Sequence, residues 1–400
     1  MTRTLFTGAS IVDGTGAEPA VADLAVEDGR IVEIGPGLDG DDRVDLAGKS
    51  VLPGLFDCHT HVTVSTIDET RNAHTPFSYR FFQAAANLEA TLRIGITTVR
   101  DAGGADLGIK QAVADGLIPG PRMQISLSMI SQTGGHGDDW VASGGELRLF
   151  PRQPGIPDTI VDGTDAMRQK VRELVRMGAD VIKVAVSGGV LSPRDKPTHA
   201  HFRQAELDVL VEEADAAGIW VMAHAQAAPG IKNGIRAGIR SIDHGIYLDD
   251  EAIQMMLDRG TWLVPTLVAP RGVIEAAEAG AAIAPQSVAK AREVAEIHRA
   301  SFAKAVAAGV KVAMGTDSGV TPHGDNLREL ALMVDGGMTP MQALVATTSS
   351  AAELMGLEAE LGTLEQGKRA DLVVVDGDPL DLATLDQRIS AVYQDGLKVS

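Results

Sequence analysis

The chain has 400 residues and a formal net charge of −19, because 54 acidic residues outnumber 35 lysines and arginines. Its length suits one large α/β barrel with an accessory unit, and 44% hydrophobic with 22% charged residues is typical of a globular protein. The acidic balance argues against nucleic acid and anionic membrane as partners, since both need a basic face. The single cysteine, Cys58, excludes an intrachain disulfide.

Targeting and membrane-spanning segments are not visible in the sequence. The N-terminal residues have no long apolar core, and no stretch approaches the ~18 apolar residues of a membrane span. We therefore expect a cytoplasmic protein that makes no membrane contact. We also expect it to form a homo-oligomer.

Short β segments separated by turn signals occur at both ends of the chain. Near the N-terminus, Asp28-Gly29 stands between two apolar runs and predicts a β-hairpin. Near the C-terminus, residues 371–376 and 389–394 have the same character. We predict that residues 1–54 and 360–400 together form one small composite β-sandwich domain.

The middle of the chain, residues 55–359, alternates short apolar runs with amphipathic stretches such as 166–177, 204–217 and 288–308. Eight such β/α units predict an α/β fold with a (β/α)8 TIM-like barrel, whose chemistry gathers at the C-terminal ends of the strands. The predicted strands are 52–56, 95–100, 123–129, 181–186, 220–223, 241–243, 262–267 and 311–314.

Residue types that bind metal ions follow or lie within five of the predicted strands. An alternating His-x-His at a strand end directs both rings to one face, although core or surface histidines without metal are the alternative. Neutral imidazole and carboxylate suit Zn²⁺ or similar divalent ions, and a catalytic site keeps an open position for water. In chain order these residues are His59, His61, Lys183, His224, His244 and Asp317.

The motifs around these residues resemble those of a known family. The stretch 51–61, Val-Leu-Pro-Gly-Leu-Phe-Asp-Cys-His-Thr-His, and the stretch 315–319, Gly-Thr-Asp-Ser-Gly, resemble the opening and closing motifs of the amidohydrolase superfamily. The form with two metal ions and a carboxylated lysine is the most similar. Within it, the stretch 186–190, Val-Ser-Gly-Gly-Val, resembles the branch of imidazolonepropionases and metal-dependent prolidases.

The resemblance implies a ligand set for two divalent ions, which we expect to be Zn²⁺. One ion is held by His59, His61 and Asp317, the second by His224 and His244, and Lys183, carboxylated by CO₂, bridges them. An unmodified ammonium would repel two cations, whereas desolvation in an apolar strand favours the neutral amine that reacts with CO₂. The alternative for Lys183 is an amine that reaches solvent at the strand end.

The reaction implied is hydrolysis by a hydroxide shared between two metal ions. Asp317 is the predicted proton shuttle, which takes the proton of the hydroxide and passes it to the leaving amine. His136, in the glycine-rich loop 133–138, is the predicted oxyanion donor, with a backbone-capping loop histidine as the alternative. Gln226, Tyr247 and His323 are predicted to contact the substrate together with His136, and ordinary packing is the alternative for Tyr247 and His323.

Other candidate residues carry weaker predictions. The second His-x-His, His199 and His201, is interpreted as solvated or as part of a lid, and 188–198 is long enough to be that lid. Its Arg194 and Lys196 either meet a substrate carboxylate or stay solvated. His298 is predicted to be exposed on a charged helix, and Cys58 to be a buried packing residue.

The leading hypothesis is a metal-dependent hydrolase of amide C–N bonds, with Xaa-Pro-type dipeptides or N-acyl amino acids as substrates. A cyclic-amide hydrolase resembling imidazolonepropionase is the alternative among enzymes, and a phosphotriesterase-like reaction uses the same kind of site. A non-catalytic barrel that serves as a binding module would lack some ligands, yet all six positions are filled. The substrate itself depends on loop geometry.

Overall fold

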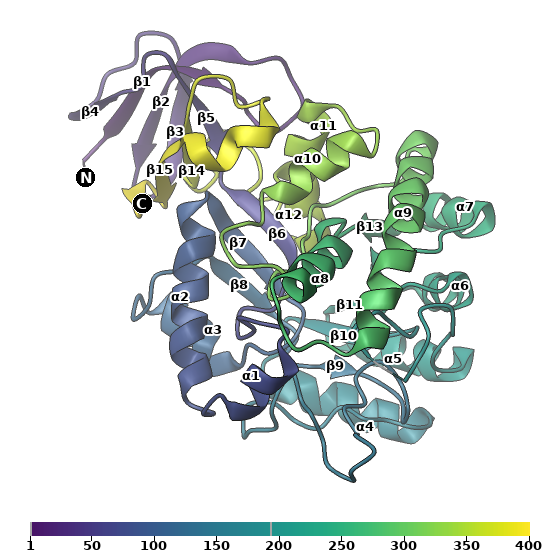
Figure 1. Cartoon of the computed structure of the whole chain (residues 1–400). Coiled ribbons are helices and arrows are strands. Elements are labelled where there is room, and N and C mark those ends of the chain that lie inside the picture. The colour runs from purple at the N-terminus through teal and green to yellow at the C-terminus, as the bar shows by residue number, and fades with distance from the viewer. Residues whose placement is uncertain (1, 193) are drawn as a thin grey trace.

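The computed structural model describes residues 2–192 and 194–400. Figure 1 shows a sheet that holds both ends of the chain, beside a larger unit in which helices surround a set of strands. None of the helices in the described chain is both long and apolar enough to cross a membrane.

The terminal sheet has eight strands, in the order β16-β15-β14-β5-β1-β2-β3, with β4 paired to β1. Asp28 and Gly29 both have positive φ and connect two antiparallel strands, so the predicted hairpin is confirmed. The strands are β1 (Thr4–Ile11), β2 (Ala20–Glu27), β3 (Arg30–Gly35), β4 (Asp42–Asp45), β5 (Lys49–Pro53), β14 (Leu372–Asp376), β15 (Ile389–Gln394) and β16 (Leu397–Lys398).

The two ends of the chain meet where β14 pairs antiparallel with β5, from Leu372 opposite Pro53 to Asp376 opposite Lys49. Apolar residues from both ends, including Phe6 and Tyr393, pack in one core cluster, and the rings of these two lie 5.0 Å apart. The prediction was a β-sandwich, which has two sheets packed face to face. The hydrogen bonds instead connect these eight strands into one continuous sheet. The N- and C-terminal labels accordingly lie close together in Figure 1.

The larger unit contains two parallel sheets with the orders β6-β7-β8 and β13-β12-β11-β10-β9. Nearly every residue of these strands is buried, as in parallel sheets that are covered on both faces. The strands are β6 (Leu55–Thr60), β7 (Ile96–Asp101), β8 (Arg122–Ile125), β9 (Met129–Ile130), β10 (Val181–Ala185), β11 (Trp220–Ala225), β12 (Ser241–His244) and β13 (Trp262–Val264).

Four predicted strands differ from the structure, and one of them, 262–267, ends early as β13 (Trp262–Val264). The first, 52–56, straddles the boundary between β5 and β6, and the third, 123–129, is split into β8 and β9 because Leu127 has a positive φ of 66°. The eighth, 311–314, makes only an isolated parallel bridge to Leu263. On its other side, the Met314 N–H donates to the carbonyl of Ala346 and not to a neighbouring strand.

Segment 311–318 nevertheless lies between the two sheets. Ala313 N donates to Leu263 O on the β13 side, and Cys58 N donates to Met314 O on the β6 side. Asp317 N donates to His59 O over 2.7 Å, which brings the end of this segment directly beside the end of β6.

Helices cover the outside of the strands in Figure 1, and the amphipathic stretches predicted as helices correspond to α4, α5 and α9. The main apolar core lies between these helices and the parallel strands. The helices are α1 (Glu69–His74), α2 (Tyr79–Arg93), α3 (Leu107–Ala114), α4 (Thr164–Arg176), α5 (Gln204–Ala216), α6 (Ala228–Ala237), α7 (Asp250–Arg259), α8 (Val268–Glu278), α9 (Pro285–Ala308), α10 (Arg328–Asp335), α11 (Pro340–Ala346), α12 (Ser349–Met355) and the short 3₁₀ helix η1 (Leu382–Arg388).

Candidate metal centre

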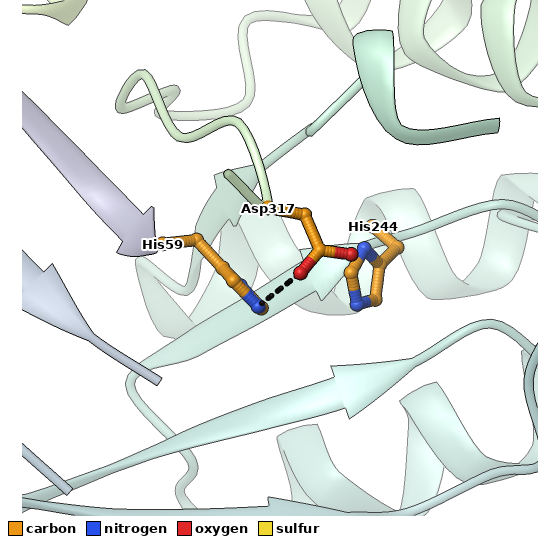
Figure 2. A group of neighbouring side chains, drawn as sticks. All are labelled: His59, His244 and Asp317. Atoms are coloured by element: carbon orange, nitrogen blue, oxygen red, sulfur yellow. Dashed lines mark ion pairs between the residues drawn. The ribbon is translucent and has the colours of Figure 1, made fainter. Parts of the chain in front are cut away.

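Two strands and segment 311–318 bring potential metal ligands together. His59 on β6, His244 at the end of β12 and Asp317 each offer one ligand atom, and these atoms lie within 4.8 Å of one another. Figure 2 shows the Asp317 carboxylate between the two imidazoles. Imidazole with carboxylate is a donor set that suits divalent transition-metal ions.

His61, the second histidine of the His-x-His pair, lies at the same centre as His59. Its Nε2 is 3.1 Å from Asp317 Oδ1, and His59 Nε2 is 3.4 Å from the same oxygen. The Nδ1 of His61 donates to the carbonyl of Gly103 over 2.8 Å, so Nε2 is the nitrogen that faces Asp317. Burial alone raises the pKa of Asp317, but the hydrogen bonds with His59 and His61 hold it well below its usual range.

The remaining predicted ligands, Lys183 and His224, line the same cavity of about 260 Å³. The ring centroids of His224 and His244 are 4.6 Å apart, and those of His59 and His244 are 5.1 Å apart. Burial, followed by nearby positive charges, lowers the pKa of His224 and His244 well below the usual value. Both imidazoles are therefore neutral, which is the form that binds metal ions.

Lys183 is 1% exposed, with its Nζ 3.4 Å from Asp243 Oδ2. Burial lowers the pKa of its amine, while the negative charges of Asp243 and Asp317 act in the opposite direction. A lysine amine that burial pushes toward the neutral form is the reactant that carboxylation by CO₂ requires. The donor set and this lysine therefore fit two divalent ions with a carboxylated bridge.

Asp243 is a site residue that the sequence reasoning missed. Its Oδ2 accepts a hydrogen bond from His59 Nδ1 over 2.8 Å, and its Oδ1 is 3.5 Å from the guanidinium of Arg100. Burial raises the pKa of Asp243, but Lys183 and Arg100 lower it far below the usual range. A carboxylate on the second nitrogen of a ligating histidine fixes its tautomer and orientation. The one feature of the sequence that pointed to Asp243 was its position directly before His244, a predicted metal ligand.

Several residues at the centre have unusual backbone angles. His244, Thr266 and Asp317 have φ of 76°, 52° and 63°, where non-glycine residues carry strain of about 1–3 kcal/mol each. Side-chain contacts hold these conformations: Thr266 Oγ1 is 2.7 Å from His244 Nδ1, and His298 Nε2 donates to the His244 carbonyl over 2.8 Å. The strand ends are therefore bent toward the cavity and held there.

His298 was predicted to be exposed, and that prediction is wrong. The side chain is 1% exposed because α9 turns this face toward the end of β12, where the His244 carbonyl accepts its proton. Burial lowers the pKa of His298 to about 4, so the imidazole is neutral.

His136 lies over the centre, as a loop residue that lines the cavity. Its ring stacks on that of His224, with centroids 4.0 Å apart and planes 17° apart. Its Nδ1 is 2.8 Å from Ser192 Oγ in the predicted lid segment.

Of the other predicted substrate contacts, Gln226 lines the cavity and is 4% exposed, and its Oε1 has no hydrogen-bond partner within the described residues. Tyr247 and His323 were expected at the mouth, but neither is among the described residues that line the cavity. Tyr247 packs against the apolar cluster that contains Ile246, and His323 Nε2 donates to the carbonyl of Val64 over 3.0 Å. Both side chains therefore pack against the protein.

The second His-x-His was interpreted as solvated or as part of a lid; His199 is exposed, as a solvated residue would be, whereas His201 is not. His201 is 4% exposed, and burial lowers its pKa to about 4. Cys58 is fully buried, as predicted, and burial raises the pKa of its thiol to about 12.

The mouth of the cavity is largely apolar, and Arg194 is a cation there that has no acidic partner among the described residues. Arg194 stacks on the ring of Trp140, 4.7 Å from its centroid. Arg148, which also lines the cavity, pairs with Glu146. Apolar lining residues are Ile67, Trp140, Val141, Leu147, Phe150, Val190, Leu191, Ile246, Val273, Ile283 and Val320.

Histidines at the ends of parallel strands, a buried lysine and an aspartate line one cavity, which is the arrangement of a candidate metal-dependent hydrolase site. The chain belongs to the amidohydrolase family, whose model matches residues 50–397. This membership, together with the relatives below, makes the protein a hydrolase that acts on amide C–N bonds.

Comparison with known proteins finds several relatives along nearly the whole chain. Ochratoxinase of Aspergillus niger is 35% identical over 414 residues, which cover 97% of this chain and 84% of the relative. Imidazolonepropionase of Rhizorhabdus wittichii is 28% identical and covers 88% and 87%. The crystal structure of a Xaa-Pro dipeptidase with bound methionine in the active site is 32% identical, covers 100% of both chains and has a TM-score of 0.90.

Proposed function

We propose that this protein is a binuclear metal-dependent amidohydrolase that cleaves Xaa-Pro-type dipeptides or N-acyl amino acids. The observation that carries the proposal is the single cavity lined by His59, His61, Lys183, His224, His244 and Asp317. The similarity to a Xaa-Pro dipeptidase and to ochratoxinase supports an amide substrate of this kind.

The proposal includes the architecture that carries the site. We propose that the two parallel sheets and segment 311–318 form a (β/α)8 barrel over residues 55–359, with residues 1–54 and 360–400 as the composite terminal domain. The hydrogen bonds on both sides of segment 311–318 support this arrangement. A cytoplasmic location and a homo-oligomeric state are part of the same proposal.

In the proposed site, His59, His61 and Asp317 hold one divalent ion, and His224 and His244 hold the other. Lys183, carboxylated by CO₂, would supply the carbamate ligand of this set, and Zn²⁺ is the proposed metal. Asp243 supports the set by holding His59 Nδ1, which leaves Nε2 for the metal.

When bound, such ions polarise the substrate carbonyl and lower the pKa of a bound water molecule to about 7. Asp317 takes the proton that the attacking water loses and delivers it to the leaving nitrogen. Hydrogen bonds with His59 and His61 hold the pKa of Asp317 low, which keeps the carboxylate in the charged form that a metal ligand needs. His136 donates to the carbonyl oxygen as negative charge develops there. The apolar lining excludes water and accepts the hydrocarbon part of the acyl group or side chain.

A cyclic-amide hydrolase is the second candidate function, favoured by the similarity to imidazolonepropionase along 88% of the chain. Purified, Zn²⁺-loaded protein assayed against dipeptides, N-acyl amino acids and cyclic amides distinguishes the two. Release of a free amino acid from the first two groups supports the main proposal. Turnover of cyclic amides alone favours the second function, and no turnover of any amide contradicts both.

His136→Ala is expected to lower kcat by about 10²–10³-fold, the usual cost of removing one oxyanion donor. Because His136 is not a proposed ligand, elemental analysis should find an unchanged metal content. If the interaction forms only in the transition state, kcat and kcat/KM fall together. A raised KM with unchanged kcat would instead assign His136 to substrate binding. His74→Ala, on the exposed helix α1, is the matched control.

Arg194→Met is expected to raise KM by about 5- to 10-fold for substrates with a free carboxylate, because Arg194 is the unpaired cation at the mouth. The same substrates with the carboxylate converted to an amide should show no change. Methionine keeps an unbranched stem that packs on Trp140. Lys196→Met removes another exposed cation of the same segment and serves as the control. An equal effect on both substrate series contradicts a role in carboxylate recognition.

A further inference from the structure

Lys290 on α9 holds the segment that was predicted to be a lid. Its Nζ donates to the carbonyl oxygens of Gly189, Ser192 and Asp195 over 2.9, 2.6 and 2.8 Å. An ammonium has three protons, and here each has a backbone acceptor on one short segment. The lysine side chain is 14% exposed, so water competes little for these bonds. Gly189, Ser192 and Asp195 are therefore held around one fixed cation.

Asp195 is the buried carboxylate of the same segment, with its side chain 3% exposed. It accepts hydrogen bonds from Gly189 N over 3.2 Å and from the hydroxyl of Ser192, and its Oδ2 is 3.5 Å from His136 Nδ1. Burial alone raises the pKa of Asp195, but His136, Ser192 and Lys290 lower it to about 2. The carboxylate is thus charged and faces His136.

The direction of these bonds determines which His136 nitrogen faces the segment. The Ser192 hydroxyl gives its proton to Asp195, so its oxygen accepts from His136 Nδ1, 2.8 Å away. Nδ1 thus donates to this segment, and no described residue holds Nε2. For Nε2 to donate to a substrate oxygen as well, the ring must be in the imidazolium form, whose positive charge faces the Asp195 carboxylate. The ring is also confined by two close neighbours: it stacks on His224, and a Cβ at Gly189 would lie 2.2 Å from His136 Cε1.

We propose that Lys290, Asp195 and Ser192 are positioning residues that act on amide hydrolysis through His136, by holding Nδ1 and presenting Nε2 to the substrate oxygen. This proposal rests on the proposed function, in which His136 contacts the substrate. Segment 188–196 then acts as an anchored support for the oxyanion donor, and its contacts explain why a long loop with two glycines packs so closely on the ring.

A double-mutant cycle on kcat tests the link to His136. Asp195→Asn and Ser192→Ala should each lower kcat about 10-fold in the parent enzyme, with KM and metal content unchanged. In a His136→Ala background the same two substitutions should change kcat by less than about 2-fold, because the residue they act through is gone. Ser192→Ala removes one hydroxyl and is the milder of the two. Equal losses in both backgrounds would overturn the proposal.

The anchoring by Lys290 has a readout that does not depend on activity. Trypsin cleaves after Arg194 only when the segment opens, and mass spectrometry detects the new N-terminus at Asp195. Lys290→Met should raise the rate of this cleavage several-fold and lower kcat only when His136 is present. Lys304→Met, an exposed lysine on the same helix, should leave both unchanged. Identical cleavage rates in the Lys290 and Lys304 variants would contradict the anchor.

The two failures are distinguishable. If the parent enzyme hydrolyses no amide, the proposed function fails, whatever the cleavage rates are. If it hydrolyses amides and Asp195→Asn costs the same with and without His136, the function stands and the positioning role fails.

Discussion

Asp317→Asn is expected to lower kcat for amide hydrolysis by about 10²–10⁴-fold, the range that general acid–base catalysis supplies. Asp317 Oδ1 lies 3.1 Å from His61 Nε2 and 3.4 Å from His59 Nε2, at the point where the proposed proton transfer and metal binding meet. Asparagine keeps the shape but removes the negative charge and the proton acceptor. The effect is measured as kcat over a pH series, with the metal content determined by elemental analysis.

The control for this substitution is Asp39→Asn, because the Asp39 side chain is fully exposed. It should retain full activity and full metal content. The parent enzyme should contain close to two metal ions per chain and lose activity on chelation. An Asp317→Asn enzyme with normal kcat would remove Asp317 from the mechanism, and full activity with one ion or none would contradict the binuclear proposal.

Lys183→Arg is expected to lower metal affinity and kcat together. Both losses should exceed about 10- to 100-fold, which is the usual cost of removing a residue that only hydrogen-bonds to a metal ligand. Carboxylation forms an N–C bond between the neutral lysine amine and CO₂ and releases a proton. A guanidinium stays charged and does not take that role. It would also place a permanent charge in a position that is 1% exposed. Metal content and kcat are the two measurements.

Lys183→Ala tests the loss of the carboxylated lysine without adding the permanent charge that arginine brings. It should bind metal poorly, and added small carboxylic acids such as acetate or propionate should partly restore activity by filling the vacated space. Lys311→Arg, at an exposed lysine, is the matched control and should behave like the parent enzyme. Full activity of Lys183→Arg would rule out a carboxylated lysine.

The part of the candidate site that depends on local spacing along a strand could be predicted from the sequence. A strand directs alternate residues to one face, so the spacing of His59 and His61 is enough to pair them. The second His-x-His shows the limit of that reasoning. His201 is buried by contacts with distant segments, among them a hydrogen bond from its own N–H to Val186 O, and composition alone made it look solvated.

Residues that act through partners far along the chain escaped prediction. Asp243 contacts His59 across 184 positions of sequence, and Lys290 contacts Asp195 across 95. Neither pair has a local spacing that marks it. His298 looked exposed because its neighbours on the helix are charged, yet one acceptor at the end of β12 accounts for its burial.

The sequence by itself determined the alternation of strands and helices, the metal-ligating residue types at the strand ends and the membership in a family, since these follow from short-range periodicity and motifs. Only the tertiary structure decided which side chains meet in the cavity. Tyr247 and His323 follow strands as His244 and Asp317 do, but their side chains pack elsewhere. The reason is physical: strand order places the ends of the strands near one another, whereas positive φ values and buried hydrogen bonds orient individual side chains around the cavity.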